Sequence, residues 1–504
     1  METLANLADG FAVALQPGML LICFIGVTIG MFVGVLPGIG AMAAIVIALP
    51  ITYHLDTTAA LIMLAGIFYG AQYGGSTASI LLNLPGTPSS AVTCLDGYPL
   101  SKGGKAGIAL FITTISSFVG GCIGILLMVW FAPALAEFAL RFSSAEYFSI
   151  MLLGLIAAST LSVGSPLKGL TMVLVGVALG FVGVDQNTGQ PRFTFDVTEL
   201  MDGVNLLSLG MGLFGVAEIL NNVGKFTEPM HANAITLRSL LPSREEWRAS
   251  VWPTLRGSAI GSAIGILPGT GGTIASFMAY ATEKRVARDP SRFGRGAIEG
   301  VASPEAANNA AVQTAFIPTL SLGIPGDAVI AILMGAMMIH GIIPGPQFIT
   351  SHPDTFWGLI ASFWIGNVLL LILNIPLIGI WVRILSIPYS ILYPAMLFFI
   401  CVGVYAMRNN PFDVYMTMVF GGIGYFMLKF QYPAAPLLLG FILGPLMEEH
   451  LKRALQLSGG DFAVFFERPI SALFIVASVL VIALALMPFI LRLPAWLRGS
   501  AAEQ

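Results

Sequence analysis

Charged side chains are scarce in this 504-residue sequence: Asp, Glu, Lys and Arg together make up 10% of it. Soluble globular proteins carry about 25% charged residues, so this composition excludes water as the main solvent of the folded chain. Hydrophobic residues make up 56% of the sequence. Apolar runs such as 106–131 and 470–491 are each long enough to span a bilayer, which takes about 20 residues. The composition therefore predicts a polytopic membrane protein.

Cysteine and histidine are also few, which argues against a metal centre or a disulfide framework. The four Cys lie apart in apolar sequence, and the five His do not cluster, so we expect small buried hydrophobes and structural His. No GxxxxGK[ST] motif occurs, because SKGGKAG at 101–107 has the wrong spacing. We therefore expect no ATPase and no cofactor, and the net charge of −3 gives no indication of a nucleic-acid partner. No basic leader or cleavage site predicts a removable signal peptide.

Lys and Arg are absent from long stretches of the chain. None precedes Lys102, 10 of the 23 lie between residues 224 and 296, and none lies between Arg295 and Arg383. Basic loops stay on the cytoplasmic side of a membrane. This predicts that segments 224–256 and 283–296 lie inside, and that residues 1–56, which carry only acids, begin and end outside.

A Pro-Gly break occurs twice in apolar sequence, as GVLPGIGAM (34–42) and GILPGTGGT (265–273). The second copy lies in the uncharged stretch 257–282, whose two flanks are both predicted to be cytoplasmic. This favours a re-entrant hairpin with arms of about 10 residues, or about 15 Å each, and a tip at 267–272 near the membrane midplane. The first copy predicts a mirrored hairpin with its tip at 36–41.

A second motif also recurs, because LNLPGTPSSAV (82–92) aligns with LGIPGDAVIAI (322–332). It predicts broken helices near 83–89 and 322–327. Paired breaks in two halves of opposite orientation are typical of secondary transporters, with the site between the repeats. The predicted fold is an all-α polytopic membrane protein with two inverted-topology repeats, each containing a re-entrant helical hairpin and a broken transmembrane helix. Its predicted parts are a first repeat at 1–222, a basic cytoplasmic linker at 223–256, a second repeat at 257–468, and a C-terminal transmembrane helix and tail at 469–504.

The breaks predict where a ligand binds. Interrupted helices expose backbone groups that hydrocarbon cannot satisfy, and the positive N-terminal ends of the returning helices suit an anion such as a carboxylate. The predicted substrate-binding residues are Pro37, Gly38, Gly40, Ala41, Thr87, Ser89, Pro268, Gly269, Gly271, Gly272 and Asp327.

Hydroxyl and amide oxygens near the broken helices predict a cation site, since such hard oxygen ligands bind Na⁺. The Na⁺ candidates are Ser76, Thr77, Asn83, Asn308, Asn309 and Ser321. The coupling ion is predicted to be Na⁺, with H⁺ as the alternative. Asp327 also fits a helix cap, and Glu305, close to the basic loop, is expected to be a first-turn helix acid and not a ligand.

Four motifs together resemble those of a known family: GVLPGIGAM, YGAQYGGSTASILLNLPGTPSS, GILPGTGGT and EGVASPEAANNAA…LGIPGD. They are similar to the large membrane subunit of the tripartite tricarboxylate transporters, over essentially the full chain. The resemblance implies a multi-pass protein of the bacterial inner membrane, working with a small membrane subunit of about four helices and a periplasmic solute-binding protein. It implies uptake of a tricarboxylate, dicarboxylate or aromatic carboxylate by secondary cation symport, and no enzyme activity.

Three alternatives stay open at this point. Mirrored half-helices also build passive anion channels, and a transporter of a neutral solute is possible. An intramembrane protease would need Ser76 as nucleophile with a base such as His340, although these two lie 264 positions apart in the sequence. Accumulation of the solute against a gradient separates a symporter from a channel. The topology of 432–468 is left open, since 432–446 fits either a crossing or a third re-entrant element.

Overall fold

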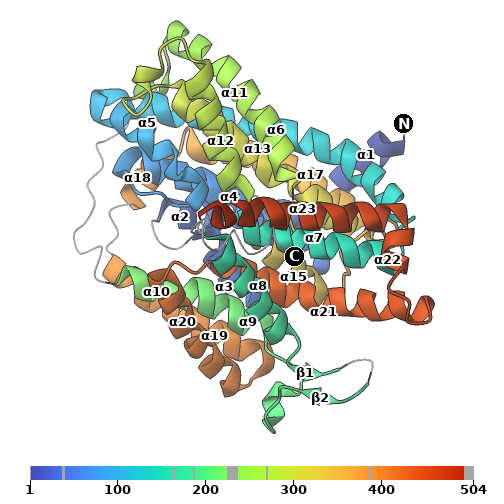
Figure 1. Cartoon of the computed structure of the whole chain (residues 1–504). Helices are drawn as coiled ribbons and strands as arrows, with labels where there is room; N and C mark the ends of the chain where they lie inside the picture. The colour runs from blue at the N-terminus through green and yellow to red at the C-terminus, as the bar shows by residue number, and fades with distance from the viewer. Residues whose placement is uncertain are drawn as a thin grey trace. The chain divides into compact units, whose positions relative to one another are not determined.

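The protein is helical almost throughout (Figure 1). This computed structural model describes residues 2–36, 40–161, 165–185, 188–223, 237–267, 271–384 and 389–492. The chain divides into two compact units, one formed by Met1–Leu140 and Val204–Phe430, the other by Arg141–Gly203 and Gln431–Gln504. Below they are called unit 1 and unit 2.

Unit 1 contains the repeated motifs and most of the helices. Its elements in the first part of the chain are α1 (Glu2–Ala14), α2 (Pro17–Val35), α3 (Gly40–Thr52), α4 (Thr57–Leu82), η1 (Pro88–Ala91), α5 (Thr93–Leu100), η2 (Ser101–Lys105) and α6 (Ala106–Ala139). Those in the middle are α9 (Leu206–Gly210), η4 (Met211–Val216), α10 (Ala217–Asn222), η5 (Leu237–Leu240), α11 (Arg244–Gly265), α12 (Gly271–Val286), η6 (Pro290–Arg292), α13 (Glu299–Thr314) and α14 (Phe316–Leu322). The last are α15 (Ala328–Ile339), α16 (Phe348–Ser351), α17 (Pro353–Asn374), α18 (Ile378–Ile384), α19 (Tyr389–Arg408) and α20 (Pro411–Lys429).

Unit 2 is built from two segments far apart in the sequence. It contains α7 (Ser144–Leu161), α8 (Pro166–Gly180), β1 (Gly183–Val184), β2 (Pro191–Arg192), η3 (Thr198–Leu200), α21 (Ala434–Leu457), α22 (Val464–Glu467) and α23 (Pro469–Arg492). The two short strands form an antiparallel ribbon in which Gly183 pairs with Arg192 and Val184 with Pro191. The segment whose topology the sequence leaves open is one continuous helix, α21, over most of its length.

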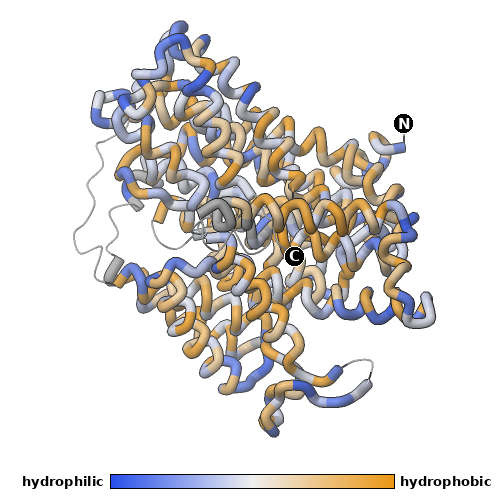
Figure 2. Tube along the Cα trace, in the orientation of Figure 1, coloured by the Kyte–Doolittle hydropathy of each residue, from blue (hydrophilic) through white to orange (hydrophobic). Residues whose placement is uncertain are grey.

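Several helices are apolar enough to lie in a membrane. In the described part of the chain, three have both the length and the composition to cross one: Pro17–Val35, Thr93–Ala139 and Pro353–Asn374. Shorter apolar helices include α3, α8 and α15. Hydrophobic residues cover most of the helical surface, and hydrophilic residues gather at helix ends and loops (Figure 2). The all-helical, membrane character predicted from composition is thus confirmed.

The helices on either side of the two Pro-Gly breaks are longer than the 10 residues expected for hairpin arms. α2 and α3 have 19 and 13 residues, and α11 and α12 have 22 and 16. α11 starts early because Ser243 and Glu246 form a capping box: the Ser243 hydroxyl accepts from the Glu246 amide, and the Glu246 carboxylate accepts from the Ser243 amide. The expected arm length was therefore wrong, and α11 begins inside the segment predicted to be a linker, of which the structure describes residues 237–256.

Glycines let two pairs of helices approach closely. In α2, three glycines four residues apart lie against the backbone of α4; in α11, three glycines with the same spacing lie against the backbone of α13. The contacts are Gly26 to Met63, Gly30 to Ile67, Gly34 to Ala71, Gly257 to Ser303, Gly261 to Ala307, and Gly265 to Ala311. Such small-residue spacing is common where membrane helices pack closely.

Both helices that receive these glycines end in a left-handed residue next to the second motif. Asn83 caps α4 with φ 59°, and Gly323 caps α14, which follows α13 directly, with φ 70°. The chain then restarts as η1 at Pro88 and as α15 at Ala328. The breaks lie at 83–87 and 323–327, next to the LPG and IPG sequences.

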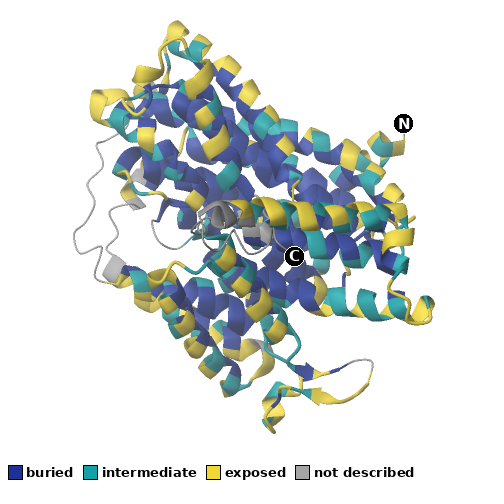
Figure 3. Ribbon diagram, in the orientation of Figure 1, coloured by how far each residue is buried: buried dark blue, intermediate teal, exposed yellow. Residues whose placement is uncertain are grey.

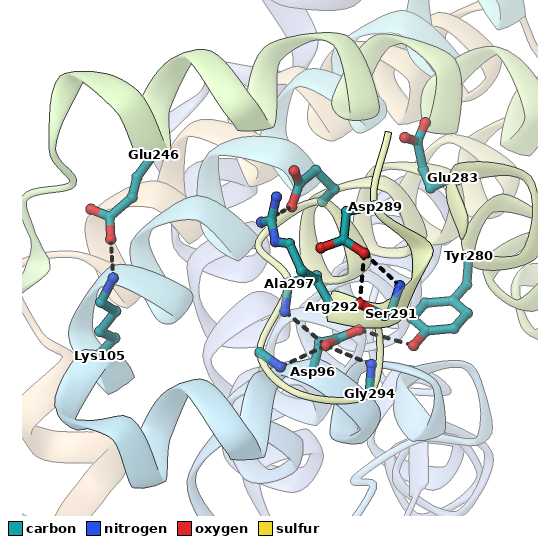
Figure 4. A network of polar contacts seen from close by, with 12 residues as sticks. Asp96, Lys105, Glu246, Tyr280, Glu283, Asp289, Ser291, Arg292, Gly294 and Ala297 are labelled. Carbon is teal, nitrogen blue, oxygen red and sulfur yellow. Dashed lines mark hydrogen bonds and ion pairs between the residues drawn. The ribbon is translucent and has the colours of Figure 1, made fainter. Parts of the chain in front are cut away.

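A buried carboxylate holds the basic segment between α12 and α13 (Figure 4). Asp96 of α5 is 0% exposed. Its Oδ1 atom accepts backbone N–H bonds from Gly294, Gly296 and Ala297 at 2.8–2.9 Å, and its Oδ2 accepts from the Tyr280 hydroxyl at 2.9 Å. Asp96 thereby ties the helix after the first break to the connection before α13.

Candidate functional site

The polar residues of the two repeated motifs lie on two adjacent buried helices, α4 and α13. α4 is buried from Ala59 to Leu81, and α13 from Gly300 to Thr314 (Figure 3). Gln72 and Ser76 are one helical turn apart, and so are Glu305 and Asn308, so each pair projects from one face of its helix. Because neither helix meets water in the chain, every polar group on these faces needs a partner inside the protein or a bound ligand.

Ser76, a predicted Na⁺ ligand, contacts Glu305 directly. The Ser76 hydroxyl donates to Glu305 Oε2 at 2.5 Å, and Thr93 of α5 donates to Oε1 at 2.5 Å. Ser117 of α6 adds a longer contact to Oε2 at 3.5 Å. Glu305 is 1% exposed and lies in the second turn of α13. The expectation that it is merely a first-turn acid beside the basic loop is therefore wrong: it lies where α4, α5, α6 and α13 meet.

A second group of contacts joins α13 to the first break. Gln72 Oε1 accepts from the Asn308 side-chain amide at 3.1 Å and from the Ser89 hydroxyl at 2.9 Å. Ser89 and Thr87 share a hydroxyl contact of 3.1 Å. Three predicted site residues, Thr87, Ser89 and Asn308, are thus brought together around a glutamine that the sequence analysis did not select.

The start of α12 lies beside the same group. An added Cβ at Gly272 would overlap the Asn308 Oδ1 atom, and one at Gly271, where φ is +59°, would lie 3.2 Å from the Asp327 Cβ. Three predicted residues, Gly271, Gly272 and Asp327, are therefore neighbours. In the first motif, Gly40 has φ +71° and begins α3, with Ala41 buried next to it.

Asp327 acts as a helix cap. Its Oδ1 atom accepts from the Ile330 amide at 2.8 Å, which makes it the N-cap of α15. Of the two roles considered from sequence, the structure shows the capping one. An additional part in ion binding stays a prediction.

Three of the predicted Na⁺ ligands lie apart from these contacts. Thr77 donates to the Tyr73 carbonyl within α4, Ser321 donates to the Ala132 carbonyl of α6, and Asn83 is exposed at the end of α4. The predicted site residues Pro37, Gly38, Pro268 and Gly269 lie outside the described residues.

Two amide oxygens in this region have no donor in the chain. Asn308 Oδ1 and Asn309 Oδ1 are buried and unpartnered, although Asn309 Nδ2 donates to the Glu305 carbonyl at 3.0 Å. Leaving such groups unmet costs about 1–3 kcal/mol each, so they are candidates for binding a cation or a polar ligand.

The sequence analysis noted the polarity of Gln72 and Glu305 but assigned neither of them to the site, and it overlooked Thr93 and Ser117. The signal for Gln72 was present, because it lies four residues before Ser76 on the same helix face. Thr93 and Ser117 lie on other helices, and no spacing in the sequence connects them to Glu305.

Positive side chains take no part in these contacts. In the described residues, no ion pair involves Glu305 or Asp327, whereas the buried Glu283 pairs with Arg256 at 2.6 Å. Charge compensation near Glu305 therefore comes from hydroxyl dipoles and helix ends. The arrangement is suited to binding small polar or charged solutes inside an apolar helical protein.

These features define an all-helical membrane protein with a buried polar site at interrupted helices, which is typical of transporters. The family model described as "Tripartite tricarboxylate transporter TctA family" matches residues 20–439. The chain belongs to this family, and is the large membrane subunit of a tripartite tricarboxylate transporter. It is therefore a transport protein and not an enzyme. In agreement, the Ser76 hydroxyl faces Glu305 and the Gln72 carbonyl, not a histidine base.

Two curated relatives come from Agrobacterium vitis. An "Uncharacterized 52.8 kDa protein in TAR-I ttuC' 3'region" is 49% identical over 490 residues, covering 97% of this chain and 97% of the relative. An "Uncharacterized protein in TAR-II ttuC' 3'region" is 54% identical over 230 residues, covering 46% of this chain and 95% of the relative. No solved structure matches the chain.

Proposed function

We propose that this subunit takes up an organic acid by cation symport and alternating access across the bacterial inner membrane. A small membrane subunit of about four helices and a periplasmic solute-binding protein are the partners in this proposal, as a three-component system requires two further parts. The substrate is a tricarboxylate, a dicarboxylate or an aromatic carboxylate. Na⁺ is the coupling ion, with H⁺ as the alternative.

The observation that carries the proposal is the start of α12 at the polar group around Gln72. Gly272, at the N-terminal end of a 16-residue helix, lies against Asn308, which in turn contacts Gln72 and through it Ser89. A helix N-terminus offers free N–H groups and a partial positive charge to a carboxylate. The amides and hydroxyls beside it fix the ligand's orientation without a lysine or arginine.

Corresponding contacts in the two halves support an internal repeat. The glycines of α2 and α11 differ by 231 positions (Gly26 and Gly257), and the residues they touch in α4 and α13 differ by 240 (Met63 and Ser303). The same shift of 240 relates the left-handed caps Asn83 and Gly323. Opposite orientation of the two halves is part of the proposal and follows from the distribution of Lys and Arg.

The test of transport is accumulation. Cells that express all three components would be given a panel of labelled tri-, di- and aromatic carboxylates, with the Na⁺ gradient intact or collapsed. A symporter concentrates one of these acids only while the gradient lasts. A channel lets the acid equilibrate in both conditions, and uptake of an uncharged analogue would favour the neutral-solute alternative.

Substitution at Gly272 tests the location of the site. Gly272→Ala places a methyl group where Asn308 Oδ1 now lies, so accumulation should fall strongly while membrane insertion is unchanged. Gly18→Ala is the matched control, because an added Cβ there meets no atom within 4 Å. Normal accumulation by the Gly272 variant would remove the start of α12 from the site.

Cation binding is tested by thermal unfolding of the purified subunit in Na⁺, K⁺ or choline. A ligand that binds only the folded state stabilises it by RT ln(1 + [L]/Kd), about 2.7 kcal/mol at a hundredfold excess over Kd. We expect a saturable, Na⁺-specific rise that is lost in Asn309→Ala. The absence of any Na⁺ effect would favour H⁺ coupling.

A further inference from the structure

Glu305 differs from the other deeply buried acids of this chain in the kind of groups that surround it. Glu283 and Glu146, each 2% exposed, are paired with Arg256 and Arg468. Asp96 is held by three backbone N–H groups. Guanidinium and backbone N–H groups only donate, so they require an ionised carboxylate at all times.

The side chains that contact Glu305 are all hydroxyls. Ser76 and Thr93 each approach one carboxylate oxygen to 2.5 Å, and Ser117 lies 3.5 Å from Oε2. A hydroxyl can donate to a carboxylate and can also accept from a protonated carboxyl group. Ser76 even has a second acceptor ready, because its hydroxyl also lies 3.2 Å from the Gln72 carbonyl. The surroundings therefore satisfy Glu305 in both protonation states.

No positive charge fixes Glu305 in its ionised form. The titratable groups within electrostatic range are Tyr73 of α4 and Cys94 of α5. α11 and α12 also pack against α13, and of their charged residues the buried Glu283 and its partner Arg256 bind each other. An unpaired carboxylate in a dry interior is costly unless it takes up a proton or a cation. The 2.5 Å contacts are hydrogen-bond distances for O–H···O⁻ pairs, so the space beside each oxygen is filled by a proton and not by a metal ion.

From this geometry we infer that Glu305 is a proton-carrying site of the transport cycle, distinct from any Na⁺ site at the amide oxygens. A proton from water adds to Oε2 to form a neutral carboxyl group, which donates to the Ser76 or Ser117 hydroxyl. The Ser76 proton then turns to the Gln72 carbonyl. The proton leaves to water again when the site faces the other side. This inference rests on the proposed function, since only a cycle that opens to both sides would move the proton across the membrane.

Infrared difference spectroscopy of the purified subunit, titrated with acid in Na⁺-free buffer, tests this directly. Formation of a neutral buried carboxyl group gives a C=O band, and we expect this band in the wild type. Glu305→Gln keeps size and hydroxyl contacts but has no proton to gain, so the band should be lost. Glu283→Gln, a buried acid with an arginine partner, is the matched control and should keep it.

A second variant keeps the test decisive if Glu305→Gln does not fold. Ser76→Ala removes one hydrogen bond from the carboxyl group, so the frequency of the band should rise. An identical band in wild type, Glu305→Gln and Ser76→Ala would overturn the assignment. So would loss, in Glu305→Gln, of a Na⁺-specific stabilisation seen in the wild type, because it would make Glu305 a metal ligand.

The two proposals fail separately in this design. The infrared band requires no transport, so its absence alongside normal solute accumulation removes only the proton site. A band without any accumulation in the complete three-component system removes only the proposed transport function.

Discussion

The close contact of α11 with α13 predicts that Gly261 tolerates no larger residue. A Cβ at this position would lie 2.6 Å from the Ala307 Cα atom and 2.7 Å from its carbonyl carbon. Ordinary contact begins at 3.4 Å, so the helices would have to separate by 0.8 Å, the difference between 3.4 and 2.6. The obstacle is backbone, so no side chain can rotate out of the way.

The size of the effect follows from two opposing terms. Overpacking a well-filled interior costs about 1–3 kcal/mol, whereas replacing glycine by alanine inside a helix gains up to about 1 kcal/mol. We expect Gly261→Ala to lower the free energy of unfolding by about 1–2 kcal/mol. Because these contacts bring α13 to its neighbours, the same separation should also displace Asn308 and reduce transport.

Thermal unfolding of the purified subunit, ranked against matched variants, measures this prediction. Gly30→Ala in α2 should behave like Gly261→Ala, since its Cβ would lie 2.8 Å from the Cα of Ile67. Gly422→Ala in α20 is the control, because nothing lies within 4 Å of its added Cβ, and it should be neutral or stabilising. The reasoning fails if Gly261→Ala unfolds at the wild-type temperature or above while Gly422→Ala does not differ from it.

Three further predictions concern buried and bridging acids. Asp96→Ala leaves three buried N–H groups without an acceptor, at about 1–3 kcal/mol each, so trypsin should cleave the segment before α13 far faster than in wild type; Asp96→Asn, which keeps an acceptor oxygen, should be much milder, and equal cleavage of both would contradict this. Arg256→Ala isolates the Glu283 carboxylate; since Arg256 is 42% exposed and thus partly screened, we expect a loss of about 2 kcal/mol, relieved by adding Glu283→Gln and refuted if the second change makes the melting temperature fall again. Finally, hydrogen bonds from the Arg192 guanidinium hold the pKa of Glu448 below its ordinary value. Stability from this pair is therefore present above the ordinary glutamate pKa, about 4.3, and is lost as the pH falls through the lower value of the folded state; melting temperatures from pH 7 to pH 3 should show a component that Glu448→Gln removes, and unchanged pH dependence in that variant would refute the assignment.

The sequence alone was sufficient for the membrane class, the helical fold and the family. These follow from composition and from local motifs: 10% charged residues can only be accommodated where lipid replaces water, and Pro-Gly pairs end helices wherever they occur. The breaks that follow Leu82 and Leu322 lie beside their Pro-Gly sequences for that reason. The lengths of the flanking helices could not be derived in the same way. α11 extends to Arg244 because a capping box starts it, and the apolar pattern of 257–282 gave no sign of that.

The composition of the candidate site was only partly visible in the sequence. Thr87, Ser89 and Asn308 were selected because they are polar and near breaks, and they do lie together. Glu305 was set aside because its neighbours in sequence are basic, yet its neighbours in space are Ser76, Thr93 and the other residues of a buried contact. Sequence distance therefore misassigned the most strongly buried acid of the second motif.

The sequence by itself determined what solvent this protein needs, where its helices break and to which family it belongs, because these depend on single residues and short motifs. Only the tertiary structure decided which polar groups meet. Ser76 and Glu305 are 229 positions apart, and their contact depends on how closely α4, α5, α6 and α13 pack. That packing is set by glycines whose role appears only when the opposing backbone is in place.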